Sequence, residues 1–463
     1  MDAAPIPPDI RWRANGKPAG PKLWPRLVRG KLFRGNAATL LLENAREYGD
    51  LVMFRVLGQP VLQFNHPELV QEMLVRDVAH HHRNRVLQRS KYILGEGLLT
   101  SEEPLHMRQR RLAQPAFHRE RIGAYGEVIS HATVGMTRAW VDGEVLDMRE
   151  QMLALALRIV GKTLFDTDLE QDVRKISEAA DSFQSFLPLA WLPFAKAVQA
   201  SPLPSMRRIR KGREELDELI YGMIRERRVD RRDRGDLLSM LMASVDEEGE
   251  ASGAAARMSD RQVRDECITV LLAGHETTAN ALSFALWLLA EHPAVQEEVA
   301  AESARVLGGR APVAADYPLL GLAERVFAEA LRLYPPVWVT ARTAAESYAY
   351  RGMRIEKGTV LVAPQLVVHR DERFYAEPMR FDPSRFTAEA KAMRPRMAYF
   401  PFGAGNRQCI GEGLAWMEGT LALAAMLQEW RVTRLEGAAR EIALAPSVSL
   451  RPRGPVMLRV ERR

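Results

Sequence analysis

The residues with the clearest chemical potential lie near the C-terminus, around the second of the chain's two cysteines. Cys409 stands in the pattern F-x-x-G-x-R-x-C-x-G, which runs from Phe402 to Gly411. A thiolate in a low-dielectric site needs hydrogen-bond donors around it, because an uncompensated buried anion is costly. Gly405 and Gly411 allow the backbone to approach the sulfur and to point N–H groups at it. The pattern therefore favours a ligating thiolate over the structural thiol that a free cysteine most often is.

The neighbours of Cys409 support the same interpretation. Phe402 is suited to cover the sulfur and exclude water, and Arg407 can reach an anionic group. Residues 410–430 are predicted to form a helix, whose N-terminus would face the thiolate and favour its charge. The other cysteine, Cys267, lies in an apolar helical stretch without such surroundings, and it is predicted to pack in the core.

This pattern resembles the haem-binding loop of the cytochrome P450 family. The resemblance implies that Cys409 is the axial ligand of the iron of haem b (iron protoporphyrin IX), where a thiolate favours cleavage of the O–O bond. It also implies that Phe402, Arg407 and Gly411 contact the cofactor, with Arg407 on a haem propionate.

A long helix is predicted over residues 260–291, with a break in its middle. Ser259 and Gln262 form a capping box, and the His-Pro pair at 292–293 ends the helix. At 1.5 Å per residue this helix is roughly 48 Å long, so it must cross the middle of a domain. Its apolar character is interrupted at residues 273–278, Ala-Gly-His-Glu-Thr-Thr. Glycine is unfavourable inside a helix and threonine can bond a carbonyl one turn back, so this break marks a candidate site.

The break matches the A-G-x-E-T-T signature of the central P450 helix and resembles most the fatty-acid hydroxylase branch. The resemblance implies an O2 groove beside the haem, with Ala273 and Gly274 at the cofactor. In that groove Thr277 would hydrogen-bond the dioxygen and Glu276 would help to relay protons. Taken alone, the same residues would indicate a helix kink with a solvated glutamate.

Glu329 and Arg332 are spaced to lie on one face of a helix. Taken alone, such a pair would be an ordinary surface ion pair of small effect. The segments that follow match the family's order, and the resemblance implies a buried network of Glu329, Arg332 and Arg385 that fixes the fold around the haem loop. Ser384 stands where the family usually has an acid, which leaves the role of Arg385 intact.

Two further segments resemble propionate contacts of the family. His106 and Arg110 are one helical turn apart on one face, as in the propionate-contact helix of bacterial members. Arg342 follows the Pro-Pro pair at the distance where the family commonly has a propionate-binding arginine. The three histidines at 80–82 lack cysteines or carboxylates at ligand spacing, so a solvated loop is predicted there rather than a metal site.

These residues are expected to sit in a fold that is mainly α with a smaller β region. The resemblance implies the cytochrome P450 fold, with the haem between the long central helix and the Cys-ligand loop. Residues 1–22 are predicted to form an extended arm, and residues 23–463 a single haem-thiolate monooxygenase domain. Periodicity predicts helices over 38–48, 67–75 and most of 105–335, strands over 51–57, 60–65 and 359–364, and a strand pair within 447–460.

Composition bounds the remaining possibilities. The 463 residues are 47% hydrophobic and 27% charged, which indicates a globular protein with a large core. Two cysteines suit a reducing cytosol, so a cytoplasmic location is expected. The net charge of +6 is modest and does not favour nucleic acid as a partner. The N-terminus lacks an apolar signal region, and the apolar run at 281–290 is too short to span a bilayer, so no membrane anchor is expected.

The resemblance implies a haem-thiolate monooxygenase of the soluble bacterial type. It would use O2 to hydroxylate or epoxidise a hydrophobic small molecule such as a fatty acid, terpenoid or steroid. Two other classes remain open: a haem-thiolate peroxygenase or isomerase, and a non-catalytic haem-binding sensor. The positions that match substrate-contact segments of the family are apolar, namely 93–99, Ala273, Val337, Trp338, Val339 and Val448.

Electrons are expected to come from another protein. The sequence contains no G-x-G-x-x-G after a strand, no phosphate-binding loop and no cysteine cluster for iron–sulfur. The expected donor is a ferredoxin or flavodoxin with its reductase. Five cations are predicted to form a basic patch for this donor: Arg108, Arg111, Lys391, Arg394 and Arg396.

Overall fold

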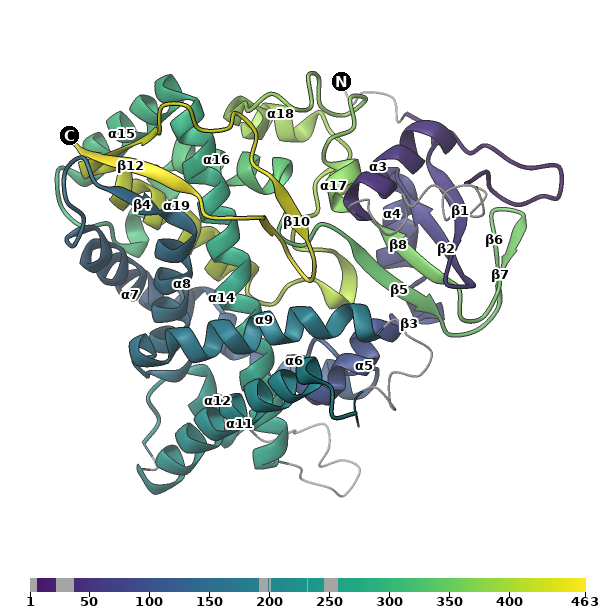
Figure 1. Cartoon of the computed structure of the whole chain (residues 1–463), viewed down its shortest axis with the longest axis horizontal. Helices are drawn as coiled ribbons and strands as arrows, with labels where there is room; N and C mark the ends of the chain where they lie inside the picture. Colours follow the sequence, from purple (N-terminus) through teal and green to yellow (C-terminus); the bar gives the residue numbers. More distant parts are fainter. Residues whose placement is uncertain (1–5, 22–36, 191–198, 200, 231, 245–256) are drawn as a thin grey trace. The chain divides into compact units, whose positions relative to one another are not determined.

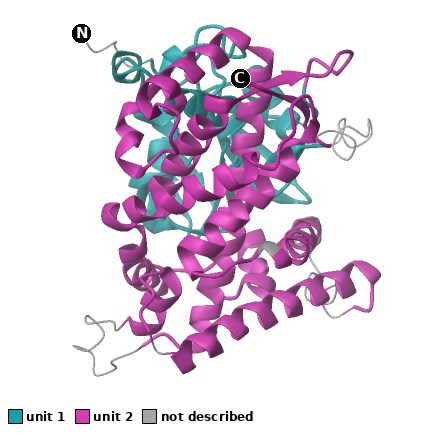
Figure 2. Cartoon of the chain, turned by 90° about the vertical axis from the view of Figure 1, so that its left-hand side faces the viewer, with its two compact units in different colours: residues 1–84, 325–409, 442–453 teal, residues 85–324, 410–441, 454–463 magenta. Residues whose placement is uncertain are grey.

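The structure, a computed structural model, describes residues 6–21, 37–190, 199, 201–230, 232–244 and 257–463. Contacts within the chain divide it into two compact units, which Figure 2 colours separately. Unit 1 comprises residues 1–84, 325–409 and 442–453, and unit 2 comprises residues 85–324, 410–441 and 454–463. The single domain expected over residues 23–463 stays a prediction.

A mixed five-stranded sheet forms the centre of unit 1, in the order β1-β2-β8-β5-β3. Strands β2 and β8 are parallel, and the other neighbours are antiparallel. Apolar residues that alternate along β1 and β8 enter two different cores, one on each face of the sheet, as the two-residue period of a strand requires. The strands are β1 Leu51–Val56, β2 Gln59–Phe64, β3 His81–Arg83, β5 Thr340–Ala344 and β8 Val360–Ala363.

Helices cover both faces of this sheet. Residues of α3 and α17 pack in the core on one face, and residues of α4 and the π turn that follows it pack in the core on the other. The other elements of unit 1 are two small hairpins, α18 and most of α16. Their bounds are α3 Ala37–Tyr48, α4 Pro67–Gln71, π turn Glu72–Arg76, α16 Gly321–Leu333, β6 Tyr348–Tyr350, β7 Met353–Ile355, α17 Gln365–Val368, α18 Ala388–Ala392, β10 Leu444–Pro446 and β11 Leu450–Pro452.

The N-terminal segment lies against β1 over the part that the structure describes. Ile10 forms a bridge with Gly49, and the N–H of Met53 donates to the carbonyl of Ala19 at 3.0 Å. A side chain at Gly20 would collide with the backbone of Met53, so glycine allows this close approach. Residues 1–5 and 22 of the predicted arm lie outside the described residues.

Unit 2 is mostly helical and carries a three-stranded antiparallel sheet in the order β4-β12-β9 (Figure 1). The strands are β4 Val145–Asp147, β9 Trp430–Arg434 and β12 Met457–Arg462. The helices are α5 Arg85–Leu94, α6 Leu105–Ala113, α7 Arg119–Thr137, α8 Met148–Phe165, α9 Val173–Ala190, α11 Pro204–Asp230, α12 Leu237–Ala243, α14 Asp260–Glu291, α15 Pro293–Leu307 and α19 Glu412–Glu429.

Helix α14 is the predicted long helix, with the bounds expected from its caps. The side chains of Ser259 and Gln262 form the capping box, and α15 begins directly after His292. Helix α14 packs along α8 and also contacts α11, α12, α15 and α19. Most of its residues outside the break are buried, which explains why its apolar character extends around much of the helix.

Most predicted elements are confirmed, and two need correction. The expected mainly α fold with a smaller β region is observed, and the helix expected at 410–430 is α19. The segment 67–75 is a short helix continued by a π turn rather than one helix. The strand pair expected within 447–460 is wrong, because β11 pairs with β10 whereas β12 pairs with β4 and β9.

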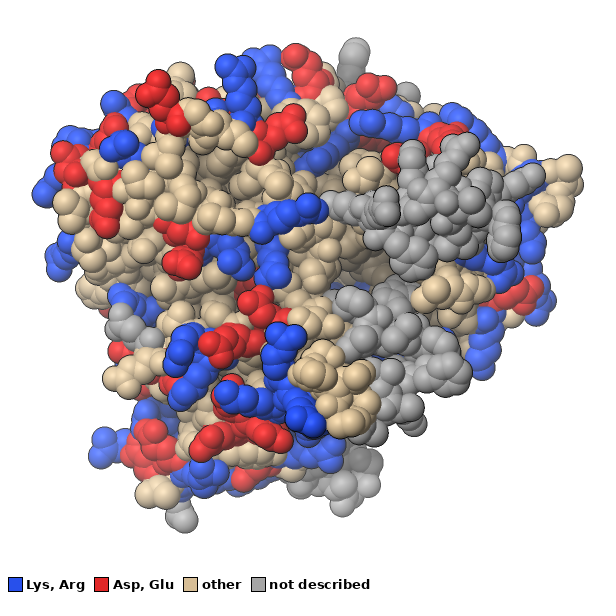
Figure 3. Space-filling view, viewed as in Figure 1, with Lys and Arg blue, Asp and Glu red and all other residues tan. Residues whose placement is uncertain are grey.

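The distribution of charged side chains on the surface and the hydropathy of the helices agree with the composition of the sequence. On the face shown in Figure 3, Lys and Arg side chains are interspersed with Asp and Glu rather than gathered in one broad patch. No helix among the described residues is long and apolar enough to cross a membrane.

Candidate functional site

The loop that carries Cys409 is a tight turn that closes on itself. A 3-10 turn over Gly405–Arg407 precedes the cysteine, whose N–H donates to the carbonyl of Phe402 at 2.9 Å. Gly405 has a φ of +73°, and a side chain there would collide with the carbonyl oxygen of Leu74. Only glycine fits such a position, so the first glycine of the pattern is required by this close approach. Gly411, in contrast, has a φ of −88°, which any residue adopts.

The two cysteines differ in the way the sequence predicted. Cys409 is exposed at the end of its loop, whereas Cys267 is fully buried in α14. Burial, reinforced by the charge of Glu266, raises the pKa of the Cys267 thiol far above its usual range, so that thiol stays protonated. Of the two, Cys409 therefore has the donor chemistry that a thiolate-ligated haem iron needs.

The predicted charge network of Glu329, Arg332 and Arg385 is confirmed within unit 1. Arg332 binds Glu329 with two hydrogen bonds, Nε to Oε2 at 2.6 Å and Nη2 to Oε1 at 2.7 Å, and neither side chain is exposed. Nε of Arg385 lies 3.5 Å from Oε1 of Glu329, and the N–H of Asp382 donates to the same oxygen at 2.9 Å. Such a network makes the surrounding loops depend on one carboxylate.

His369 connects this network to the segment before the cysteine loop. Its carbonyl accepts from Nη1 of Arg332 at 2.9 Å, and its Nε2 accepts from the N–H of Phe400 at 2.9 Å. Burial and the charge of Arg332 hold the pKa of His369 well below its usual value, so the ring is neutral and can accept. Sequence reasoning missed His369, because an isolated histidine outside any motif gives no signal.

The break in the apolar pattern of α14 lies within a continuous helix and makes specific contacts. Oγ1 of Thr277 donates to the carbonyl of Ala273 at 2.6 Å, one turn back along the helix. A side chain at Gly274 would lie 2.8 Å from Cγ2 of Val160, so this glycine lets α14 approach α8 closely. Ala273 is exposed on the helix surface, and Thr277 is partly exposed.

Glu276 is not freely solvated, as it would be if the break were only a helix kink. Its Oε1 accepts a hydrogen bond from Nε2 of Gln184 on α9, and Gln184 itself is buried. The threonine hydroxyl and the glutamate carboxyl therefore lie one residue apart on the same helix, each held by a defined partner. Such a pair can hold and pass protons.

The predicted propionate contacts lie in ordered elements. His106 on α6 is buried, and its Nδ1 lies 3.0 Å from Oε1 of Glu103. Arg110 is one turn further along α6 and is half-buried. Arg342 on β5 is buried, and its Nη1 donates to the carbonyl of Ala341 at 3.0 Å.

The histidines at 80–82 correct one prediction, because they do not form a solvated loop. His80 stacks on Tyr348, with ring centroids 4.6 Å apart, and its Nδ1 lies 2.8 Å from Glu346. His81 begins strand β3 and bonds the carbonyl of Met73 and the hydroxyl of Tyr348. Strand β5 provides the pairing edge that the polar sequence of β3 did not reveal.

Two other predicted positions have surroundings that the sequence did not show. Trp338 packs in a core of unit 1, and its Nε1 donates to the carbonyl of Ser447 at 3.1 Å. The guanidinium of Arg394 lies over the rings of Tyr375 and Phe386, at 4.7 and 5.0 Å from their centroids. Arg394 therefore covers aromatic rings beside the Arg332 network rather than extending into solvent, whereas Arg396 is exposed.

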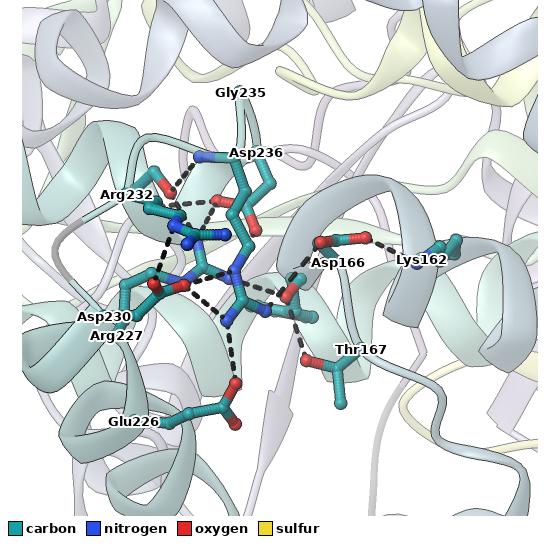
Figure 4. Close-up of polar contacts among 12 residues, drawn as sticks. Lys162, Asp166, Thr167, Glu226, Arg227, Asp230, Arg232, Gly235 and Asp236 are labelled. Carbon is teal, nitrogen blue, oxygen red and sulfur yellow. Dashed lines mark hydrogen bonds and ion pairs between the residues drawn. The ribbon is translucent and has the colours of Figure 1, made fainter.

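A second buried arginine network lies in unit 2 and was missed altogether (Figure 4). Nη1 and Nη2 of Arg227 each donate to one carboxylate oxygen of Asp236 at 2.8 Å. Arg227 also donates to the hydroxyl of Ser239 and, at 3.1 Å, to the carbonyl of Phe165 at the end of α8. Asp236 in turn caps α12 by accepting the N–H of Ser239.

Comparisons with known proteins agree with the motifs. The profile of the cytochrome P450 family matches residues 18–460. Cyclooctatin synthase of Streptomyces melanosporofaciens is 37% identical over 458 residues, which cover 97% of this chain and 96% of that protein. Pentalenene oxygenase of Streptomyces avermitilis is 35% identical over 86% of this chain and 88% of that protein.

A third relative and a solved structure extend the agreement. Cyclooctat-9-en-7-ol 5-monooxygenase of Streptomyces melanosporofaciens is 33% identical over 84% of each chain. The crystal structure of the cytochrome P450DA heme domain superposes with a TM-score of 0.83 at 26% identity, covering 96% of this chain and 97% of that chain.

Proposed function

This chain belongs to the cytochrome P450 family, and from that premise we propose that its substrate is a cyclic terpenoid. The protein is a haem-containing monooxygenase that uses O2 and electrons from a redox partner to oxidise a hydrophobic small molecule. The proposal of a terpenoid rests on one observation: the three relatives above act, by their names, on pentalenene, on cyclooctat-9-en-7-ol or in making cyclooctatin. These relatives favour a terpenoid over the fatty acid that the A-G-H-E-T-T stretch suggested.

We also propose the roles of the residues around the cofactor. Cys409 would hold the iron of haem b through its sulfur, and the haem would supply the activation of O2. His106, Arg110, Arg342 and Arg407 are proposed to hold the haem propionates, with Phe402, Gly411, Ala273 and Gly274 in contact with the cofactor. The exposed thiol of Cys409 and the ordered, buried positions of His106 and Arg342 support these assignments.

Thr277 and Glu276 are proposed to manage protons for the reaction. A hydroxyl that donates to a helix carbonyl keeps its lone pairs free to accept, so Thr277 can receive one hydrogen bond while making another. The amide of Gln184 that donates to Glu276 is neutral, so this hydrogen bond does not require the carboxyl to stay charged. A peroxygenase would not need this acid–alcohol pair, so the pair favours the monooxygenase.

The redox partner is proposed to be an acidic ferredoxin or flavodoxin with its reductase. Support comes from exposed basic residues of the predicted patch, Arg111 on α6 and Arg396 before the cysteine loop. Attraction between opposite charges acts mainly on the association rate and weakens with salt. A cytoplasmic location is part of the same proposal, and it is supported by the two free cysteines.

The haem and substrate assignments are tested together by spectroscopy. The ferrous carbonyl complex is expected to absorb at about 450 nm, as thiolate ligation requires. Cys409→His should abolish that band. Cyclic terpene hydrocarbons and alcohols are expected to shift the Soret band and to yield oxygenated products, whereas fatty acids of similar size should do neither. A protein that hydroxylates fatty acids but not terpenoids would overturn the proposed substrate.

Replacing Thr277 by alanine tests the proton assignment. Substrate binding should stay within twofold of the wild type, because the hydroxyl bonds its own helix. Product formed per NADPH should fall by about tenfold or more, with hydrogen peroxide rising in its place, as expected when a positioned proton donor is lost. Thr277→Ser, which keeps the hydroxyl, is the matched control and should restore most of the coupling. Unchanged coupling in the alanine variant would reduce Thr277 to a helix-bending residue.

A further inference from the structure

A short loop of unit 2, residues 95–101, is fastened to α14 through its backbone. The N–H of Glu96 donates to Oδ2 of Asp265 at 2.8 Å, and the N–H of Leu98 donates to Oε2 of Glu266 at 3.0 Å. Two consecutive carboxyl groups of one helix thus bind two alternate N–H groups of one loop. Leu98 is buried, and residues 93–99 match the substrate-contact segment identified above.

The loop and α14 approach too closely for ordinary side chains. Gly95 has a φ of +67°, and a side chain there would collide with the carboxylate of Asp265. A side chain at Gly97 would collide with Oγ1 of Thr269 and would lie 2.6 Å from the backbone oxygen of Asp265. Both glycines are therefore required by this contact, which indicates that the loop position is specified rather than incidental.

The two carboxyl groups are not equivalent. Asp265 has a cation, because Nη1 of Arg264 donates to its Oδ1 at 2.8 Å. Glu266 is fully buried, and its Oε1 has no hydrogen-bond partner among the described residues. Burial, with a smaller contribution from the charge of Asp265, raises the pKa of Glu266 to about 8.

A half-satisfied buried carboxyl group is unfavourable, and an apolar residue would avoid that cost. An apolar residue would, however, leave the N–H of Leu98 without the acceptor that Glu266 provides. The only described role of the Glu266 side chain is therefore to fix the backbone at Leu98.

We propose that Glu266 is a positioning residue for substrate selectivity, which acts by holding the backbone of residues 95–101 on α14. The inference rests on the proposed function, since it takes residues 93–99 as a substrate-contact segment. With the loop held, Leu98 and Leu99 present a fixed apolar surface, and bulky hydrophobic ligands are selected by their fit to it. With the loop released, that selection weakens while the cofactor loop in unit 1 is unaffected.

The test uses the holoprotein and two iron-binding probes, imidazole and 4-phenylimidazole, whose dissociation constants are read from Soret shifts. Glu266→Ala should weaken 4-phenylimidazole by about tenfold, the size expected for one lost buried hydrogen bond, and leave imidazole unchanged. Hydrogen exchange at the Leu98 amide should accelerate in the same variant. Glu266→Gln keeps an acceptor for that amide and should restore both readouts to within about twofold.

Ser283→Ala is the matched control, because Ser283 is a buried residue of α14 whose hydroxyl donates only to the carbonyl of Ala279, away from the loop. If Glu266→Ala fails to fold, Gly97→Ala is the second variant, because its added side chain displaces the loop from α14. It should also lower the affinity for 4-phenylimidazole relative to the affinity for imidazole. The proposal would be overturned if the folded variants showed no change in hydrogen exchange at the Leu98 amide, or no change in the affinity for 4-phenylimidazole relative to imidazole. An effect of Ser283→Ala as large as that of Glu266→Ala would also overturn it. Neither probe is a terpenoid, so these outcomes do not depend on the proposed substrate.

Discussion

Arg332 in unit 1 and Arg227 in unit 2 both bind a carboxylate through two hydrogen bonds, but their surroundings differ. Arg332 is fully buried, and its remaining N–H groups donate to three backbone carbonyls. Arg227 is 5% exposed, and it shares its carboxylate Asp236 with the cap of α12. The Glu329 carboxylate faces two guanidinium groups, those of Arg332 and Arg385, whereas Asp236 binds the guanidinium group of Arg227. Removing the carboxylate should therefore cost more in unit 1, where it leaves two cations, one of them fully buried.

Removing the unit 1 carboxylate should have the largest effect. Glu329→Ala leaves the fully buried Arg332 and the half-buried Arg385 without their counter-ion, which costs about 5 kcal/mol, the upper part of the range for broken buried pairs. We expect aggregated protein or protein without haem, read from the ratio of Soret to protein absorbance after purification. Glu329→Gln, which keeps the shape but not the charge, should be intermediate. An alanine variant that holds haem and melts like the wild type would show that the network is dispensable.

Asp236→Ala is the equivalent change in unit 2 and should cost less, about 3 kcal/mol. The change leaves one guanidinium group, that of Arg227, without its carboxylate, whereas Glu329→Ala affects two. Part of the loss, about 1 kcal/mol, comes from the missing cap of α12. Urea unfolding measures the total, and Asp236→Asn, which retains the cap, should recover part of it. A cost equal to that of Glu329→Ala would show that the second guanidinium group near Glu329 does not matter.

The two networks also show what the sequence reveals. Glu329 and Arg332 are three residues apart on one helix, so helical geometry places them together and the family order identifies Arg385. Arg227 and Asp236 belong to different helices joined by a loop, and no period relates them. Local patterns also did not predict the contact of Gln184 with Glu276 or that of residues 96–98 with α14, because these contacts join segments far apart in the chain. Caps, periodicity and the cysteine motif are local signals, and the predictions that rested on them, such as the bounds of α14, were confirmed.

Acid should lower the folding stability of both units, and in unit 2 part of this loss can be assigned to one histidine. Burial lowers the pKa of His275 on α14 from 6.5 to about 4. The unfolded chain then binds a proton that the folded protein excludes, so this contribution to stability is complete above pH 6.5 and is lost as the pH falls towards 4. At pH 5 the loss is about 2 kcal/mol. His275→Gln should remove this part of the pH dependence of urea unfolding. An unchanged slope between pH 6.5 and 5 would show that His275 does not titrate in this way.

The smallest effect is expected at the rim of the unit 2 network, where the arginine is more exposed than Arg227. Arg234 belongs to the same cluster as Arg227, and its Nη2 donates to Glu226 at 2.8 Å and to Asp230 at 2.9 Å. Its side chain is 24% exposed, so water can solvate all three groups when the pair is broken. Arg234→Ala should therefore change the free energy of unfolding by less than about 1 kcal/mol, and by less still in high salt. Arg227→Ala is the matched comparison and should cost several times more, because it leaves the buried carboxylate of Asp236 without the cation that Arg227 provides. Equal costs for the two arginines would mean that burial does not decide how much each contributes to the free energy of unfolding. The contrast between the two units would then lose its physical basis.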